Sequence, residues 1–494
     1  MISVPLIVAM VACVAGIANF SYDAAMINSL NILEAFQTYF SLNSKWTGLI
    51  VAIVNIGSIA AMPFSGLVMD KYGRRRGMMV GSVIALVGAA LQASAQEIGQ
   101  LLAGRFFIGA SFIFTAAGGA PWLMEIASAN QRRIITNSML GSLPIVGMCG
   151  GIVFLYIWDY DSEWSWRGGL LGEIIGPLVS LIALIFSPES IRYLVSNDRM
   201  GEAFDVLVKL RGTSADDIDT IIEFDQIKNT LRHEHETETS NAWVPLFKPA
   251  SNFRRFSIAV LTQIFYQTNG SNFMQAFFSL VLVSAGVTDK KLLLKIGIGN
   301  SAWAACATIL GIFMIEKFGA RPMMLWSTPV LCIGFILMAI LQNRSEATGH
   351  HGYSMSAVAV CFLFQAASFS SWIILAFSFP SEILKYSQRA RGIAVSQAIG
   401  YLFATMMAFT VPLAIEHIPW EFFIICAAWV APMFPVIWWL FPDTQGRTLE
   451  EVDALFEGSA AEEWLHTGES IEGRPDSPDG KMASRKSGGR VSLT

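Results

Sequence analysis

Asp70-Lys71-Tyr72-Gly73-Arg74-Arg75-Arg76 is a basic turn that ends a long apolar stretch of the chain. A second basic turn, Glu316-Lys317-Phe318-Gly319-Ala320-Arg321, ends another apolar stretch much later in the sequence. In both copies an acidic residue, a lysine, an aromatic residue and a glycine precede the arginine. A motif that returns in the same setting indicates an internal duplication. The sequence therefore predicts two similar halves, each built from membrane-spanning helices.

The composition is typical of a membrane protein. Of the 494 residues, 53% are hydrophobic and only 14% are charged, and the mean hydropathy is +0.51. A soluble domain does not need so much apolar surface for its core, so lipid is the expected solvent. Runs of about 20 apolar residues predict about twelve spans. They lie near 4–28, 46–69, 78–96, 100–121, 136–158, 168–187, 256–284, 291–315, 322–342, 354–379, 391–415 and 419–441.

Lysine and arginine are concentrated in the loops that follow predicted spans two, four, eight and ten. By the positive-inside rule, these loops, the middle loop and both termini are predicted to be cytoplasmic. We expect a six-helix half at 1–187, a cytoplasmic linker with short helices at 188–253, a second six-helix half at 254–456 and a tail at 457–494. The tail has too few apolar residues to offset the entropy of ordering, so it is predicted to be disordered. The first span starts close to the first residue, which leaves open whether the N-terminus is complete.

Further motifs are spread along the whole chain. They are Tyr22-Asp23, Gly104-Arg105-Phe106, Ala120-Pro121, Trp166-Arg167, Pro188-Glu189-Ser190, Gln267 with Gly270 and Asn272, Arg389-Ala390-Arg391-Gly392 and Pro442-Asp443-Thr444. With these motifs the chain resembles the sugar porter family of the major facilitator superfamily, and Met26-Ile27-Asn28 is most similar to its lactose-permease-like fungal branch. The resemblance implies the major facilitator fold, an all-α membrane protein with twelve transmembrane helices in two six-helix halves. It also implies transport by alternating access.

Charged residues at the cytoplasmic ends of the predicted spans form one candidate site. They would meet when the two halves rock, in ion pairs that exist in only one conformation and so set the balance between two states. By the resemblance, this inner gate consists of Asp70, Arg74, Arg75, Glu125, Arg132, Glu316, Arg321, Glu382 and Arg389. The alternative is that the arginines only fix the topology. Topology alone, however, does not require that Glu125 and Arg132 repeat at the spacing of Glu382 and Arg389.

Asp23 and Arg105 lie within predicted spans and form a second candidate site. A charge inside a spanning helix costs roughly 2.5 to 3.5 kcal/mol on insertion scales, so we expect these two side chains to pair. A pair that breaks and re-forms with conformation would couple transport to protons, and in the resembling family such a pair accompanies proton symport. The alternative is that Asp23 lies at a hydrated helix end and only caps the helix.

Glu173 lies inside predicted span six, where the resembling family usually has glutamine. A carboxylate at this depth needs a hydrogen-bond donor or a proton of its own. One hypothesis is therefore that Glu173 is a second protonatable group for proton coupling. The other is that it belongs to an outer vestibule and is already in water, and the sequence does not separate the two.

Predicted span seven is rich in amide side chains, which bind sugar hydroxyls because they both donate and accept hydrogen bonds. The predicted solute-binding residues are Gln263, Gln267, Asn269, Asn272, Gln275 and, in span ten, Phe377. Hydrogen bonding between helices is the alternative role for the amides. Several polar positions of the family pattern are apolar in this chain, such as Leu140 and Phe377. The pocket is thus expected to suit a solute with fewer hydroxyls than glucose, or a non-sugar metabolite.

The leading hypothesis is a proton-coupled symporter of a sugar or sugar-like solute. The alternatives are an exporter of a less polar metabolite on the same fold and a sensor that binds sugar without carrying it. An enzyme is not expected, because the sequence has no Gly-x-Ser-x-Gly elbow or phosphate loop, and no cofactor is predicted. His233 and His235 could bind a metal, but a solvated loop is the simpler interpretation, so no metal site is predicted. We expect a monomer in the plasma membrane that does not bind nucleic acid.

Overall fold

The computed structural model describes residues 3–127, 132–157, 163–214, 216–237, 247, 250–287, 289–348, 351–384, 386–445 and 456. For residues 120, 132–141, 230–237, 351 and 386–390, only the backbone is described. The chain divides into two units, Met1–Gln445 and Gly446–Thr494, and all helices discussed below belong to the first unit. Every regular element in the described ranges is a helix. The tail that the sequence predicts at 457–494 lies outside the described residues.

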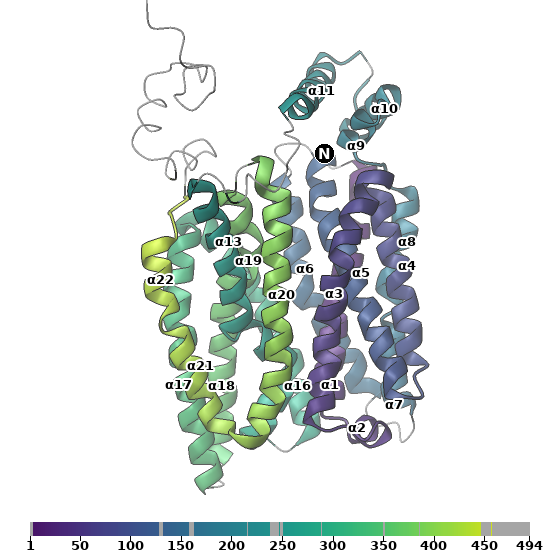
Figure 1. Cartoon of the computed structure of the whole chain (residues 1–494). Helices are drawn as coiled ribbons and strands as arrows, with labels where there is room; N and C mark the ends of the chain where they lie inside the picture. The colour runs from purple at the N-terminus through teal and green to yellow at the C-terminus, as the bar shows by residue number, and fades with distance from the viewer. Residues whose placement is uncertain are drawn as a thin grey trace, which may run out of the picture. The chain divides into compact units, whose positions relative to one another are not determined.

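The first half of the chain contains long helices that correspond to the first six predicted spans (Figure 1). They are α1 (Val4–Leu30), α3 (Ser44–Tyr72), α4 (Arg74–Ala93), α5 (Ile98–Ile126), α6 (Arg132–Ile157) and the consecutive pair α7 (Trp164–Gly172) and α8 (Ile175–Phe186). A short helix, α2 (Glu34–Tyr39), connects α1 to α3. In this half α1 packs against α5, α6 and α8, and α4 packs against α5 and α8.

The second half repeats this arrangement with more interruptions. Its helices are α13 (Ala250–Thr268), α14 (Ser271–Ala276), α15 (Phe278–Ser284), α16 (Lys290–Phe318), α17 (Ala320–Thr348), α18 (His351–Ala367), α19 (Ile373–Ile383), α20 (Tyr386–His417), α21 (Pro419–Val430) and α22 (Met433–Leu440). A π-helical segment, η1 (Ser368–Trp372), joins α18 to α19. The two halves meet where α3 packs against α20 and α6 packs against α16.

Among the described residues, ten helices are long and apolar enough to cross a membrane. The fifth predicted span corresponds to α6, whose apolar part Ser142–Ile157 is shorter. The seventh corresponds to the interrupted series α13, α14 and α15. Each of the twelve predicted spans therefore has a helix or a group of consecutive helices in the structure.

The seventh crossing is interrupted at Gly270, which has φ of +97°, a value that favours glycine. The side-chain Oδ1 of Asn269 accepts a hydrogen bond from Ser271 N at 2.9 Å and so bridges the interruption. A Cβ atom at Gly270 would lie only 2.3 Å from Cζ of Phe335. Backbone conformation and packing therefore both require glycine at this position.

Helices α3 and α5 approach each other closely through glycine. A Cβ atom at Gly109 would lie 1.9 Å from the carbonyl oxygen of Val54, and one at Gly57 would lie 2.2 Å from that of Phe106. The Ser58 hydroxyl donates to Gly109 O at 2.9 Å across the same contact. The backbone of α3 between Val54 and Ser58 is therefore held firmly against α5.

The middle of the chain forms α9 (Ile191–Ser196), α10 (Met200–Arg211) and α11 (Ile218–Thr237), which lie in the predicted linker. Figure 1 shows them at one end of the helices, opposite the end that carries α2 and α7. Arg211 binds both carboxylate oxygens of Glu223, at 2.6 and 2.8 Å, and donates to Ile126 O at 3.0 Å. These bonds attach the middle helices to the end of α5.

Candidate functional site

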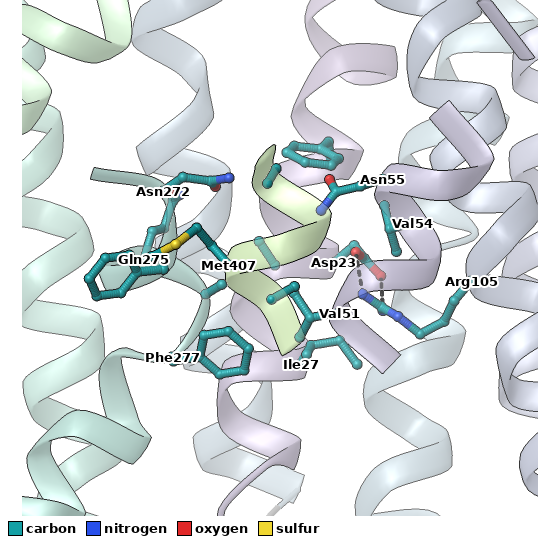
Figure 2. Close-up of a pocket in the computed structure, with 16 residues that line it drawn as sticks. Asp23, Ile27, Val51, Val54, Asn55, Arg105, Asn272, Gln275, Phe277 and Met407 are labelled. Atoms are coloured by element: carbon teal, nitrogen blue, oxygen red, sulfur yellow. Dashed lines mark hydrogen bonds and ion pairs between the residues drawn. The ribbon is translucent and has the colours of Figure 1, made fainter. Parts of the chain in front are cut away.

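Asp23 of α1 and Arg105 of α5 form a buried, two-pronged ion pair (Figure 2). Arg105 Nη1 lies 2.7 Å from Asp23 Oδ1, and Nη2 lies 3.3 Å from Oδ2. Arg105 Nε donates to Ile50 O at 2.7 Å, which fixes the plane of the guanidinium. Each of the two residues is 2% exposed. The predicted pairing is therefore present, and Asp23 is not a cap at a hydrated helix end.

Glu173 lies at the junction between α7 and α8, and its side chain is fully buried. Gln92 of α4 donates from Nε2 to Glu173 Oε2 at 2.9 Å, while Gln92 Oε1 lies 3.5 Å from Arg105 Nη1. Gln92 thus links the Glu173 carboxyl to the Asp23–Arg105 ion pair. The Oε1 atom of Glu173 has no hydrogen-bond donor among the described residues. Such burial excludes the interpretation of Glu173 as a vestibule residue in water.

The proton cluster, as we call Asp23, Glu173, Arg105 and Gln92, holds two acids and one guanidinium. With both acids ionised its formal charge is negative, and with one proton bound it is neutral. Unbalanced charge is costly in a buried site, whereas balanced and hydrogen-bonded charge costs much less. This arrangement is chemically suited to taking up and releasing a single proton.

The ion pair forms one wall of a cavity that α1, α3, α5, α14 and α20 line together. Figure 2 shows Asn272 and Gln275 of α14 on the far side of this cavity from Arg105. Apolar side chains, including those of Phe277 and Met407, complete the lining. The cavity can therefore offer hydrogen bonds to a solute from a few points, within largely apolar surroundings.

The five amides predicted for span seven have different roles in the structure. Gln263 donates to Ala376 O at 2.7 Å, and Asn269 accepts from Ser271 N, so these two amides hold the backbone in place. Gln267 Oε1 accepts from Asn272 Nδ2 at 2.5 Å. Of the five, Asn272 and Gln275 are the ones that line the cavity.

Phe377, the remaining predicted solute-binding residue, packs edge-on against Tyr266 with ring centroids 6.3 Å apart. A second cavity lies between α1, α6, α15 and α16 and shares Ala24 and Gln275 with the first. Asn300 lines this second cavity, and its buried Oδ1 atom has no hydrogen-bond partner among the described residues.

Four amides at these sites were missed by the sequence reasoning: Gln92 in the proton cluster, Asn55 in the first cavity, and Asn28 and Asn300 in the second. Each lies in a predicted span that contains at most one other amide. The rule that a polar group in a membrane helix needs a partner or a cavity would have selected all four. The sequence pattern favoured the five amides of predicted span seven instead.

The first part of the predicted inner gate lies where α3 ends and α4 begins. Arg74 lies 3.6 Å from Asp70 and 3.9 Å from Glu125, at the end of α5. Arg75 N donates to Glu189 Oε1 at 2.9 Å, so the start of α4 is joined to the chain that follows α8. Asp70, Arg74, Arg75 and Glu125 are therefore brought together at one end of the first half.

The second part of the predicted gate has different partners. The Thr444 hydroxyl donates to Glu382 Oε2 at 2.9 Å, and Arg321 donates to the carbonyl oxygen of Trp438. Glu316 lies in the last turn of α16, just before the second basic turn. Glu382 and Arg321 therefore each bind a neutral partner within the second half.

Arg132 and Arg389 complete the predicted gate, but their side chains lie outside the part of the chain that the structure describes. The contacts given above for the other gate residues each lie within one half. Ion pairs that cross between the halves at this end stay a prediction.

Polar contacts between the halves are found at the opposite end, where α2 lies. Asn28 Oδ1 accepts from Ser279 N at 2.9 Å and connects α1 to α15. Lys290 Nζ lies 3.0 Å from Glu34 Oε2 and connects α16 to α2. The two halves are therefore joined by polar bonds at the end away from the basic turns.

The sequence profile of the sugar (and other) transporter family matches residues 8–456. The chain belongs to this family. Relatives of this sugar transporter family member include the MFS-type transporter oryC of Aspergillus oryzae, 25% identical over 91% of this chain and 85% of that protein. High-affinity glucose transporter 1 of Candida albicans is 25% identical over the same shares. The sugar transporter STL1 of Saccharomyces cerevisiae is 26% identical over 90% of this chain and 80% of its own.

Solved structures of similar fold include the proton:xylose symporter XylE bound to 6-bromo-6-deoxy-D-glucose, with a TM-score of 0.75. That protein is 21% identical, and the match covers 91% of this chain and 99% of the other. An inward open structure of XylE from E. coli matches with a TM-score of 0.73 at 20% identity, over the same shares. The predicted family and the predicted major facilitator fold are thus confirmed for this sugar transporter family member.

Proposed function

We propose that this chain is a secondary active transporter that couples the import of a sugar or sugar-like solute to protons by alternating access. One observation carries the proposal: the buried Asp23–Arg105 pair, linked to Glu173 through Gln92, forms a wall of the cavity that Asn272 and Gln275 also line. A proton site and a solute site that share a wall can influence each other. Such coupling is reciprocal, so bound solute also changes the affinity for protons.

Charge balance gives a physical basis for the coupling. One proton on the acids of the proton cluster makes it neutral, and a neutral group passes through a closed, dehydrated state at lower cost than a charged one. After the proton leaves on the other side, Arg105 again holds an ionised Asp23 for the return step. Gln92 links Glu173 to Arg105, so a proton on either acid neutralises the same cluster.

The lining of the cavity supports a hydroxylated solute with apolar faces. Amides such as Asn272 and Gln275 match hydroxyl groups, and rings such as Phe277 match the C–H faces of a sugar. The names of the Candida albicans glucose transporter and of XylE agree with this class of solute. Since much of the lining is apolar, we infer a solute with fewer hydroxyls than a hexose, or one that uses only some of them.

We infer that the basic turns and both termini are cytoplasmic, from the positive-inside rule. The contacts Asn28–Ser279 and Glu34–Lys290 then lie on the outer side, which supports assigning the structure to a state closed to the outside. In this proposal the gate residues near Arg74 act on the inner side. The proposed location is the plasma membrane, the proposed active form is a monomer, and the solute is carried without chemical change.

A second candidate function is export of a less polar metabolite. The apolar part of the cavity lining, which includes Ile27, Val51 and Val54, favours it. An exporter driven by protons would exchange solute against protons instead of moving both in the same direction. The direction of solute flow in vesicles with an imposed pH gradient separates the two candidates.

Uptake of labelled sugars and polyols by cells that lack their own carriers tests the proposal. We expect accumulation of at least one of them above its outside concentration at acidic outside pH, and loss of this accumulation when a protonophore removes the gradient. Accumulation that persists without the gradient would rule out proton coupling, and solute movement against an inward proton flow would favour export.

A further inference from the structure

Asn55 is an amide on α3 that lines the first cavity and has no role in the fold described so far. None of the described residues forms a hydrogen bond with its side chain, and the residue is only half-buried. An amide in a membrane helix is costly unless it meets a partner, water or a ligand. The amide of Asn55 therefore has free donors and a free acceptor to offer to whatever occupies the cavity.

The position of Asn55 is fixed by its neighbours on α3. Val51, Val54 and Asn55 are at the helical spacing i, i+3 and i+4, so they share the face that lines the cavity. On the adjacent face, the close contact at Gly57 and Gly109 holds the helix against α5. A side chain on such a restrained backbone can form hydrogen bonds without first paying a large ordering entropy.

The opposite wall carries the matching groups. Figure 2 shows the amides of Asn55 and Asn272 at about the same height on opposite sides of the cavity, with Gln275 and Asp23 below them. Among the residues that line this cavity, Asn55 is the one amide from the first half, whereas Asn272 and Gln275 come from the second. A solute bound to both walls would be in contact with both halves at once.

We propose that Asn55 is a solute-binding residue, and that it binds hydroxyl groups of a polyol or sugar from the first half while Asn272 and Gln275 bind it from the second. The inference rests on the proposed function, and it names a residue that determines which solutes the transporter binds. A carboxamide presents a donor and an acceptor side by side, which matches two neighbouring hydroxyls of a polyol.

Contact with both halves has a consequence for transport. A ligand shifts a conformational equilibrium only through its different affinities for the two states. A solute held by one half alone keeps the same contacts when the halves move. A solute held between Asn55 and Asn272 gains or loses contacts as the cavity opens and closes, so its binding drives the change.

The test uses labelled D-glucose and its monodeoxy analogues as probes, in cells that lack their own hexose carriers. In Asn55→Leu, which has a similar volume and no amide, we expect KM to rise about tenfold, the loss of roughly one hydrogen bond worth about 1.4 kcal/mol. Vmax per copy at the surface should change less than KM. Asn55→Ser, which keeps a hydroxyl, should recover part of the affinity and also controls for folding.

A thermodynamic cycle between the protein and the probe identifies the contact. If Asn55 binds a particular hydroxyl, the analogue without that hydroxyl binds the wild type more weakly, but Asn55→Leu binds it no more weakly than glucose. Equal losses for every analogue in both proteins would overturn the inference. So would an unchanged KM with a shifted pH profile, which would mean that Asn55 acts on Asp23 instead.

The same experiment separates the two levels of the proposal. A wild type that carries no sugar or polyol at any pH overturns the proposed function and the role of Asn55 together. In the other outcome, the wild type carries glucose or an analogue, while the loss of the Asn55 amide and the loss of each hydroxyl have additive effects on affinity. That result leaves the proposed function standing and rejects only the role of Asn55.

Discussion

Gln92 donates a hydrogen bond to Glu173 at 2.9 Å and also faces Arg105, so a single amide joins the second acid of the proton cluster to the ion pair. The four side chains of this cluster come from α1, α4, α5 and the junction of α7 and α8. They lie in one half of the protein, although the proposed solute cavity is shared by both halves. In the proposed mechanism, protons therefore bind within the first half, and their effect on the second half passes through the cavity.

Glu173→Gln should change the pH dependence of uptake. The substitution keeps the shape of the side chain but removes one acid, so the cluster becomes balanced when Asp23 alone is ionised. We expect the initial uptake rate to depend less steeply on the outside pH, because one fewer group in the cluster can bind a proton. An unchanged profile, with normal surface expression, would mean that Glu173 does not exchange protons during transport.

Asp23→Asn should abolish accumulation while leaving exchange of solute across the membrane. The variant cannot carry the negative charge that Arg105 neutralises. The proton gradient can therefore no longer drive net uptake of the solute. Counterflow, in which unlabelled solute on one side draws in labelled solute, does not need net proton movement and should persist. Loss of counterflow together with accumulation, in a correctly folded variant, would assign Asp23 to solute binding or folding instead.

Gln92→Leu should destabilise the protein by about 1 to 3 kcal/mol, because Glu173 then loses a buried hydrogen-bond donor. The thermal midpoint in detergent measures the effect. The double variant with Glu173→Gln should lose less stability than the sum of the single variants, since the two side chains are in contact. Strictly additive losses would show that the bond at 2.9 Å contributes little.

Gly109→Ala should destabilise the protein by roughly 1 to 3 kcal/mol through overpacking, because the new Cβ would lie 1.9 Å from the backbone oxygen of Val54. Gly66→Ala, on α3, is the matched control, since no heavy atom lies within 4 Å of its Cβ position. The control should leave the thermal midpoint unchanged or raise it slightly, because alanine favours helix. Equal effects of the two substitutions would contradict the close contact between α3 and α5.

The sequence was sufficient for the fold because the signals are long and repeated. The apolar runs and the turns at Gly73 and Gly319 specify where helices begin and end, and the cost of a charge in lipid predicts that Asp23 meets Arg105. These inferences depend on the hydropathy of the residues, which identifies lipid as the solvent, and on the spacing of the motifs. Both can be read from the sequence. Rotation of a helix about its axis cannot be read with the same certainty.

The cavity shows this limit. Five amides on one span were expected to line the solute site, yet Gln263 and Asn269 serve the backbone. The interruption at Gly270 turns the following residues relative to α13, so Asn272 and Gln275 reach the cavity while earlier amides do not. Single amides such as Asn55 were missed because only the neighbouring helices decide whether such a residue faces lipid, protein or a cavity.

The hydrogen bond from Arg75 N to Glu189 also limits how the first half can move. It ties crossing three to the chain that follows crossing six, so these two helices cannot shift along each other at this end without breaking it. We therefore expect the first half to tilt as a rigid body. Bending should occur at the seam between the two halves, where α3 faces α20 and α6 faces α16. Substitutions along that seam would alter how fast the two orientations interchange, whereas a change at Glu189, whose carboxylate accepts the bond, would make the first half less rigid.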